Sequence, residues 1–327
     1  MFFFSSVISQ AEEDQIFEIN VSKNLLGTVI EAKVISKDIT AAKKALYFAF
    51  KEIERIDSLF SFQNKNSVIS RINKMAGISA VKVSRETYEL ISDAKEFSKK
   101  YQGLFDITIG SISVLWGFNS DGDIQIPSKT EIENLLPTVD YRLIELDKEN
   151  LTVFLKKKDM KIDPGGIAKG YAVDRAAALL IKQGLNNFML NAGGDVYAAG
   201  KNAEGLDWSI GIKHPRKNDE ALATVRVNNL AVSTSGDYER HIIKNGKRYH
   251  HILLPATGYS GDLCQSVTVL TDNSEEGTVL AKYIFLLGYE KFASTKFAAT
   301  VKYLLVSTDG SIKFSPELKE NDLILIK

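Results

Sequence analysis

A glycine pair followed by a lysine is the strongest chemical feature of the sequence. Gly165 and Gly166 precede Lys169 within residues 162–174, which run straight into an amphipathic helical pattern. Glycine at a helix start lets backbone N–H groups approach an anion, and the helix dipole adds to the attraction. A phosphate there would lie within reach of the Lys169 ammonium. A plain tight turn would contain the same glycines, and the spacing matches neither a P-loop nor a dinucleotide-binding fingerprint, so both interpretations stay open.

Two further runs place small polar residues next to glycine. Residues 191–195, Asn-Ala-Gly-Gly-Asp, follow an expected buried strand and put flexible backbone and a carboxylate at its end. Residues 233–238 bring hydroxyl groups beside a glycine, which suits hydrogen bonding to a phosphate or to the edge of a cofactor ring. An ordinary hairpin turn and an ordinary Ser/Thr turn would have the same sequences.

A histidine pair, His250 and His251, stands shortly before the Pro-Ala-Thr-Gly sequence of residues 255–258. Neighbouring side chains on a strand point to opposite faces, so at most one of the two would enter a given site. Their spacing to His214 and His241 does not suggest a zinc site. Taken alone, a structural role explains a histidine here better than a catalytic role.

These residues must be positioned by strands and helices that do not alternate regularly. Apolar alternation over residues 16–36 predicts two strands around Asn24 and Gly27, and helical spacing from Ala42 to Ile56 predicts a helix. Ser128 and Glu131 form a capping box for a short helix. Longer helices are expected at residues 84–103, 166–182 and 275–288, and strands around 146–150 and at 188–191, 208–212, 223–227, 231–233, 266–270 and within 302–314. This order predicts an α+β fold: one domain with mixed or antiparallel sheets and flanking helices.

Composition excludes several classes of function. Basic and acidic residues number 41 each, and no long basic run occurs, so the signature of a nucleic-acid-binding protein is missing. Cys264 is the single cysteine, which excludes an intramolecular disulfide and a multi-cysteine metal site. No apolar run reaches the roughly 18 residues of a transmembrane segment. The chain starts with apolar residues, so we interpret residues 1–12 as a signal-peptide remnant or a disordered N-terminus. The domain is then expected at residues 13–327.

Taken together and in order, these runs resemble the ApbE family, the FAD:protein FMN transferases. The resemblance covers nearly the whole chain, and seven ordered blocks are a specific signal although each block alone is weak. The matching segments are residues 26–28, 59–62 with 67–73, 105–108 with 115–118, 163–174, 191–195, 234–238 and 251–258.

The resemblance implies an ApbE-like domain that moves the FMN half of FAD to a threonine or serine hydroxyl of an acceptor protein carrying a flavinylation motif, with release of AMP. It makes His251 the candidate base and Lys169 the residue that holds phosphate, and magnesium is the expected metal. The implied FAD-binding residues are Gly27, Thr28, Phe62, Asp106, Gly165, Gly166, Lys169, Asp174, Asn191, Gly193, Gly194, Asp195, Thr234, Ser235, Gly236, His251 and Thr257.

The implied metal site departs from the family pattern. The carbonyl of Ala168 is retained as a candidate ligand, whereas Thr278 and Lys282 stand where the family has an aspartate and a threonine. Threonine is a poor ligand for a hard cation that prefers carboxylates, so magnesium affinity should fall. The Lys282 ammonium could itself supply the positive charge, or Lys282 could be a solvated surface residue. Glu275 and Glu276 lie on other helix faces from Thr278, which disfavours them as substitute ligands.

Other replacements bear on activity. Leu254, Ala256 and Val68 stand where the family has charged residues. Three functions follow as hypotheses: an active transferase, an FAD-binding paralogue that acts as a carrier or interaction partner, and a slow hydrolase of FAD. Family members are commonly exported, so the cell envelope or periplasm is the expected location, with the cytoplasm as the alternative.

Overall fold

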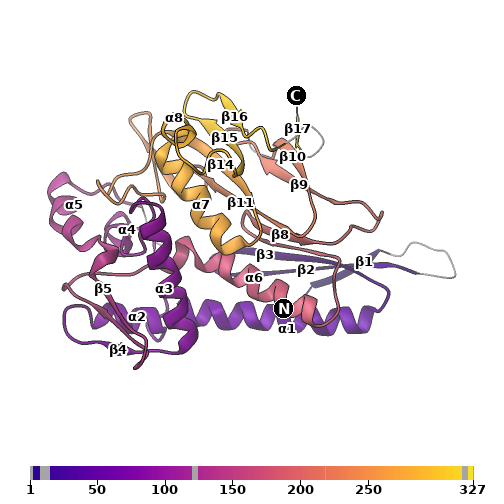
Figure 1. Ribbon diagram of the computed structural model, residues 1–327, viewed down its shortest axis with the longest axis horizontal. Helices are drawn as coiled ribbons and strands as arrows, with labels where there is room; N and C mark the ends of the chain where they lie inside the picture. Colours follow the sequence, from indigo (N-terminus) through magenta and orange to yellow (C-terminus); the bar gives the residue numbers. More distant parts are fainter. Residues whose placement is uncertain (1–2, 8–14, 120–123, 218, 319–322, 327) are drawn as a thin grey trace.

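The computed structural model describes residues 3–7, 15–119, 124–217, 219–318 and 323–326, and a large antiparallel sheet forms its centre (Figure 1). Within these ranges the large sheet has nine strands. In spatial order they are β1 (Phe3–Val7), β2 (Phe17–Leu25), β3 (Thr28–Ser36), β7 (Phe188–Ala192), β8 (Asp195–Ala199), β11 (Leu230–Gly236), β14 (Cys264–Thr271), β15 (Lys302–Ser307) and β16 (Ile312–Phe314).

Three helices pack on one face of this sheet: α1 (Ile39–Phe60), α6 (Ala168–Lys182) and α7 (Ser274–Leu287), with α6 between the other two (Figure 1). Helix α1 begins where the Asp38 side chain accepts a hydrogen bond from the Ala41 amide at 2.9 Å. The apolar stripe expected from the sequence, from Ala42 to Ile56, is buried in the main core. Each fully buried Ile or Leu contributes about 1.5–3 kcal/mol, so this face holds α1 on the sheet.

A second, smaller sheet covers the opposite face. Its strands are β17 (Leu323–Leu325), β10 (Ala221–Val227) and β9 (Trp208–Lys213). Buried residues of both sheets, among them Trp208, Val225 and Leu304, form a separate apolar cluster. The described part of the molecule therefore has three layers, with the large sheet in the middle and the helices and the small sheet outside.

The remaining elements lie beside the helical layer (Figure 1). They comprise the short sheet β4 (Val81–Lys82), β6 (Thr152–Leu155) and β5 (Ile144–Asp147), the hairpin β12 (His241–Lys244) and β13 (Lys247–His250), the helices α2 (Val68–Lys74), α3 (Arg85–Lys100), α4 (Gly110–Trp116), α5 (Lys129–Leu135) and α8 (Tyr289–Ala293), and the 3-10 turns η1 (Leu136–Thr138), η2 (Tyr141–Leu143) and η3 (Pro164–Gly166).

The α+β prediction is confirmed, and the paired strands of the described residues run antiparallel. The capping box at Ser128 and Glu131 is present in full. Residues 3–7 form a strand against β2, whereas residues 8–14 lie outside the described residues. The division at residues 12 and 13 stays a prediction. No helix in the described ranges is long and apolar enough to cross a membrane.

Candidate active site

Two tight hairpin turns meet at one end of the large sheet. Leu26 and Gly27 connect β2 to β3, and Gly193 and Gly194 connect β7 to β8, all four with positive φ. Because β3 pairs with β7, the turns lie side by side, and a Cβ added to Gly193 would lie 2.3 Å from Thr28 Oγ1. With φ at +61°, Gly193 needs glycine both for its backbone and for space. Four of the implied FAD-binding residues are thus brought together.

The second turn is held by side-chain and backbone hydrogen bonds. Asn191 Oδ1 accepts the Gly194 amide at 3.1 Å, and the Gly194 carbonyl accepts the Thr234 amide at 3.0 Å. The Thr234 hydroxyl lies 2.8 Å from the Thr268 hydroxyl. The expected hairpin turn is confirmed, whereas a role of this segment in FAD binding stays a prediction. Asn191 and Thr234 orient the turn, which fixes the position of Asp195 directly after it.

The segment before α6 brings the glycine pair to the same region. Asp163 accepts two hydrogen bonds, from the Gly165 amide at 2.9 Å and from Asn119 Nδ2 at 2.6 Å. The Gly165 amide is thus directed at Asp163. Ile167, the N-cap residue, makes no side-chain capping bond, so the first-turn N–H groups of α6 are the ones suited to an anion.

A chain of polar contacts joins α6, β8 and α7. Lys169 Nζ lies 3.6 Å from Asp195 Oδ2, and the Thr278 hydroxyl donates to the same oxygen at 3.2 Å. Lys282 Nζ donates to the Thr278 hydroxyl and to the Thr278 carbonyl, each at 3.1 Å. Asp195 Oδ1 is buried and has no hydrogen-bond partner. Burial, partly opposed by Asp195, lowers the pKa of Lys282 to about 8. One carboxylate thus stands between two lysines, and the cluster is cationic whenever Lys282 is protonated.

His251 lies beside this cluster as a neutral imidazole. Burial lowers its pKa well below the ordinary value, and the charges of the neighbouring His250, Lys282, Lys169 and Arg240 lower it further. Its Nδ1 is buried without a partner. The neighbouring His250 is instead a packed residue whose Nε2 lies 2.7 Å from the Gly261 carbonyl. The structure therefore separates the two histidines, with His251 at the lysine cluster.

Two of the implied FAD-binding carboxylates are engaged elsewhere. Asp106 is buried, and its oxygens accept the amide and hydroxyl of Thr108 at 2.8 and 2.6 Å and the Tyr141 amide at 2.8 Å. Asp174 accepts the amides of Ser274 and Glu275, both at 2.8 Å, at the start of α7. Burial raises the pKa of each. Both carboxylates serve as anchors for backbone amides.

In the described part of the chain, the remaining implied residues make no hydrogen bond or ion pair with the lysine cluster. Phe62 is half-buried against the main core. Ser235 is buried in β11, and a Cβ on Gly236 would collide with the Tyr238 ring at 2.3 Å. Thr257 is exposed in the turn that follows Leu254. Roles for these residues in FAD binding stay predictions.

Arg240 is a site residue that the sequence did not single out. A Cβ on Gly27 would lie 2.8 Å from Arg240 Nη2, and Arg240 Nη1 donates to the Phe118 carbonyl at 3.2 Å. Its carbonyl accepts the His251 amide at 3.1 Å. In the sequence, the one indication that Arg240 belongs to this region is that it follows the hydroxyl-rich run of residues 233–238.

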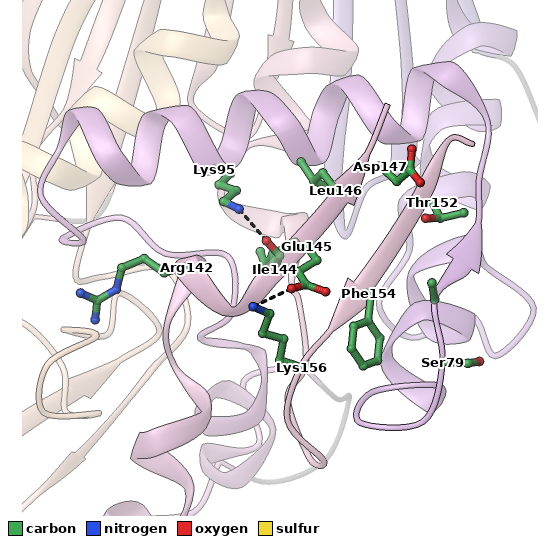
Figure 2. Close-up of a pocket in the computed structure, with 11 residues that line it drawn as sticks. Ser79, Lys95, Arg142, Ile144, Glu145, Leu146, Asp147, Thr152, Phe154 and Lys156 are labelled. Carbon is green, nitrogen blue, oxygen red and sulfur yellow. Dashed lines mark hydrogen bonds and ion pairs between the residues drawn. The ribbon is translucent and has the colours of Figure 1, made fainter. Parts of the chain in front are cut away.

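A large cavity of about 790 Å³ lies away from these residues, on the short sheet beside α3 (Figure 2). Charged side chains that line this cavity already have partners within the protein. Lys95 Nζ donates to the Ile144 carbonyl at 2.5 Å, and Lys156 pairs with Glu145 at 2.6 Å. None of the implied FAD-binding or metal residues lines it. We therefore place the candidate site at the hairpin turns, the two lysines and His251, and not at this cavity.

Comparison with known proteins identifies the family of this chain. A sequence model of the ApbE family matches residues 26–303. The chain belongs to the ApbE family. It is 32% identical over 303 residues to a FAD:protein FMN transferase of Klebsiella pneumoniae, covering 89% of this chain and 92% of that protein. It is 31% identical over 283 residues to the one from Treponema pallidum, covering 82% and 78% of the two chains.

Solved ApbE structures share the fold. The ApbE protein of Thermotoga maritima superposes with a TM-score of 0.84 at 33% identity, covering 92% of this chain and 97% of that one. The flavin transferase ApbE of Vibrio cholerae gives a TM-score of 0.82 at 25% identity, covering 92% and 98%. The α+β architecture of this ApbE chain is therefore that of its family.

Magnesium does not fit the residues at the implied metal site. Mg²⁺ prefers near-octahedral oxygen ligands, usually including carboxylates. Here the Thr278 hydroxyl accepts a hydrogen bond from Lys282 and donates one to Asp195, and an ammonium cannot be a metal ligand. Glu276 Oε1 accepts from Lys100 at 2.5 Å, and Glu275 lines a different cavity. In the described ranges no group of three or more His, Cys, Asp or Glu side chains could hold a metal.

Proposed function

We propose that the protein transfers the FMN half of FAD to a hydroxyl group of an acceptor protein. The observation that carries this proposal is the cluster of Lys169 and Lys282 with Asp195 and Thr278, with the neutral His251 beside the two lysines. Cationic groups next to unpaired helix amides suit a pyrophosphate, and a neutral imidazole suits a proton acceptor. Family membership supports FAD as donor and a protein as acceptor.

The transfer is a displacement at the FMN phosphorus. The acceptor oxygen forms a bond to that phosphorus, and the bond from the same phosphorus to the bridging pyrophosphate oxygen breaks. AMP leaves with the bridging oxygen, and the hydroxyl proton passes to the imidazole of His251. Because its pKa lies well below the ordinary value, His251 is unprotonated at neutral pH and free to accept that proton.

The protein contributes mainly orientation and charge. The two hairpin turns lie side by side at the end of the large sheet, and Lys169 is held toward the site by Asp195. Fixed cationic groups near a pyrophosphate stabilise the charge that develops on the leaving phosphate. Alignment of the acceptor hydroxyl with the scissile bond supplies the remainder of the rate enhancement.

The test is to incubate the purified protein with FAD and a peptide of the form Asp-X-X-Thr-Gly-Ala, with AMP followed by chromatography and the peptide by mass spectrometry. Transfer predicts AMP and FMN-labelled peptide in equal amounts, and none of either product with a matched peptide in which alanine replaces the threonine. AMP without labelled peptide would identify an FAD hydrolase. FAD binding with neither product would identify a carrier and contradict the proposal.

A further inference from the structure

The Lys282 side chain folds back along α7 instead of extending into solvent. Lys282 lies one turn after Thr278, and its ammonium returns to the Thr278 carbonyl and hydroxyl. The aliphatic part of the side chain passes Gly166, where an added Cβ would make ordinary contacts of 3.7 Å with Lys282 Cε and 3.8 Å with Cδ. Lys282 thus lies at the implied metal position, hydrogen-bonded within α7 and packed beside η3.

The charge on Lys282 is not matched by an acid of its own. Both of its hydrogen-bond acceptors are neutral oxygens of Thr278, and none of the described acids lies within ion-pair distance of it. The nearby Asp195 is contacted by Lys169 and the Thr278 hydroxyl. An ammonium has one more N–H donor than these two bonds use. Such a group, aimed into a site for a pyrophosphate, can take an anionic oxygen as its remaining acceptor.

We propose that the Lys282 ammonium, together with Lys169, neutralises the FAD pyrophosphate in the position where a divalent cation would otherwise bind, so that this enzyme needs no metal. This inference rests on the proposed function of the site. A lysine ammonium acts as a compact point charge. It can therefore neutralise a pyrophosphate without the coordination geometry that a metal ion requires. Lys282 would contact a pyrophosphate oxygen directly and would stay hydrogen-bonded to Thr278.

Binding measurements test the charge without requiring turnover. Affinities for FAD and for riboflavin, which lacks the pyrophosphate, are measured by flavin fluorescence with EDTA and with added Mg²⁺. We expect wild-type FAD affinity to be the same in both. Lys282→Met should weaken FAD binding at least about tenfold and leave riboflavin unchanged, since one charge-assisted contact is lost. Lys282→Arg should keep most of the affinity. Lys182→Met, at the exposed end of α6, is the matched control and should change neither.

Turnover and metal binding complete the test. The wild type should release AMP at the same rate in EDTA and in Mg²⁺, and calorimetry should detect no Mg²⁺ binding. The double variant Thr278→Asp with Lys282→Thr should bind Mg²⁺ and depend on it. Wild-type FAD binding or AMP release that is lost in EDTA and restored by Mg²⁺ would overturn the inference, as would unchanged FAD affinity in a folded Lys282→Met protein. Metal-free, Lys282-dependent FAD binding without any transfer would uphold the charge role and refute the proposed function alone.

Discussion

The first and second halves of α7 carry opposite charge. Its first turn, with Glu275 and Glu276, lines an acidic cavity of about 340 Å³ together with Asp174 and Asp93. About two turns further along, Lys282 and the α6 residue Lys169 form the cationic cluster with Asp195 and Thr278. Carboxylates at a helix N-terminus satisfy amides and the dipole, so the acidic end is explained by the helix itself. Lys282 has only neutral hydrogen-bond acceptors on Thr278, which supports the proposal that the anionic substrate binds beside it.

The largest effect on the transfer rate is expected for His251, which lies beside Lys169 and Lys282. His251→Asn should lower the rate of FMN transfer by about 10²–10⁴-fold with little change in FAD affinity, because it removes the proton acceptor. The readout is AMP release under saturating FAD and acceptor peptide. His250→Asn is the matched control: it should lower thermal stability and leave the rate per folded molecule nearly unchanged, because His250 contacts the Gly261 carbonyl. If His251→Asn transfers FMN at the wild-type rate, His251 is not the proton acceptor.

The contact between α6 and the start of α7 should be the next most sensitive position, here with respect to stability. A Cβ on Gly170 would lie 2.3 Å from the Ser274 carbonyl, where α6 meets the start of α7. Gly170→Ala should therefore destabilise the protein by about 3 kcal/mol, since backbone must move to relieve the clash. Urea unfolding measures this change. A loss below about 0.5 kcal/mol would show that the helices can separate without cost.

Asp174 distinguishes a structural carboxylate from a substrate-binding one. Asp174→Ala leaves the Ser274 and Glu275 amides without their acceptor and should cost about 2 kcal/mol of unfolding free energy. FAD affinity of the folded variant should stay close to wild type. If FAD affinity falls while stability is retained, Asp174 belongs to the substrate site and the contrast between the two halves of α7 is wrong.

The smallest effect is the pH dependence caused by Glu275. Burial, with the charges of Asp93 and Asp174, raises the pKa of Glu275 from 4.5 to about 7. Because the folded state binds this proton more tightly, the free energy of unfolding should fall as the pH rises from 4.5 to about 7. Glu275→Gln should abolish that loss and gain about 1–2 kcal/mol relative to wild type at pH ~8, and nothing at pH ~4. Equal gains at both pH values would mean that the carboxyl is not perturbed.

Local patterns in the sequence were enough to predict most of the fold. The glycines at 193 and 194 follow a short apolar strand and adopt the positive φ angles of a tight hairpin turn. Ser128 and Glu131 cap α5 as their spacing predicted. The β12–β13 hairpin was missed, although its Asn245-Gly246 turn is a strong hairpin signal, because its strands carry few apolar residues.

The site could be predicted as a set of residues but not as a set of contacts. The resemblance to the family pointed to Lys169, Asp195 and Thr278. In the structure both Lys169 and Thr278 contact the Asp195 carboxylate. The same resemblance assigned Asp174 to FAD binding, whereas its contacts hold the start of α7. Direction of side chains depends on packing between elements far apart in sequence, as with Lys282 beside Gly166. No local pattern encodes such directions.

The most direct test of the account is oxygen-isotope tracing of the reaction in H₂¹⁸O, with FAD, the acceptor peptide and mass spectrometry of both products. The account predicts AMP and FMN-labelled peptide in equal amounts, neither containing ¹⁸O, because the acceptor hydroxyl attacks the FMN phosphorus and AMP keeps the bridging oxygen. Incorporation of ¹⁸O into free FMN or AMP, with the peptide unmodified, would mean that water is the nucleophile and would contradict the assignment of this chain as a transferase.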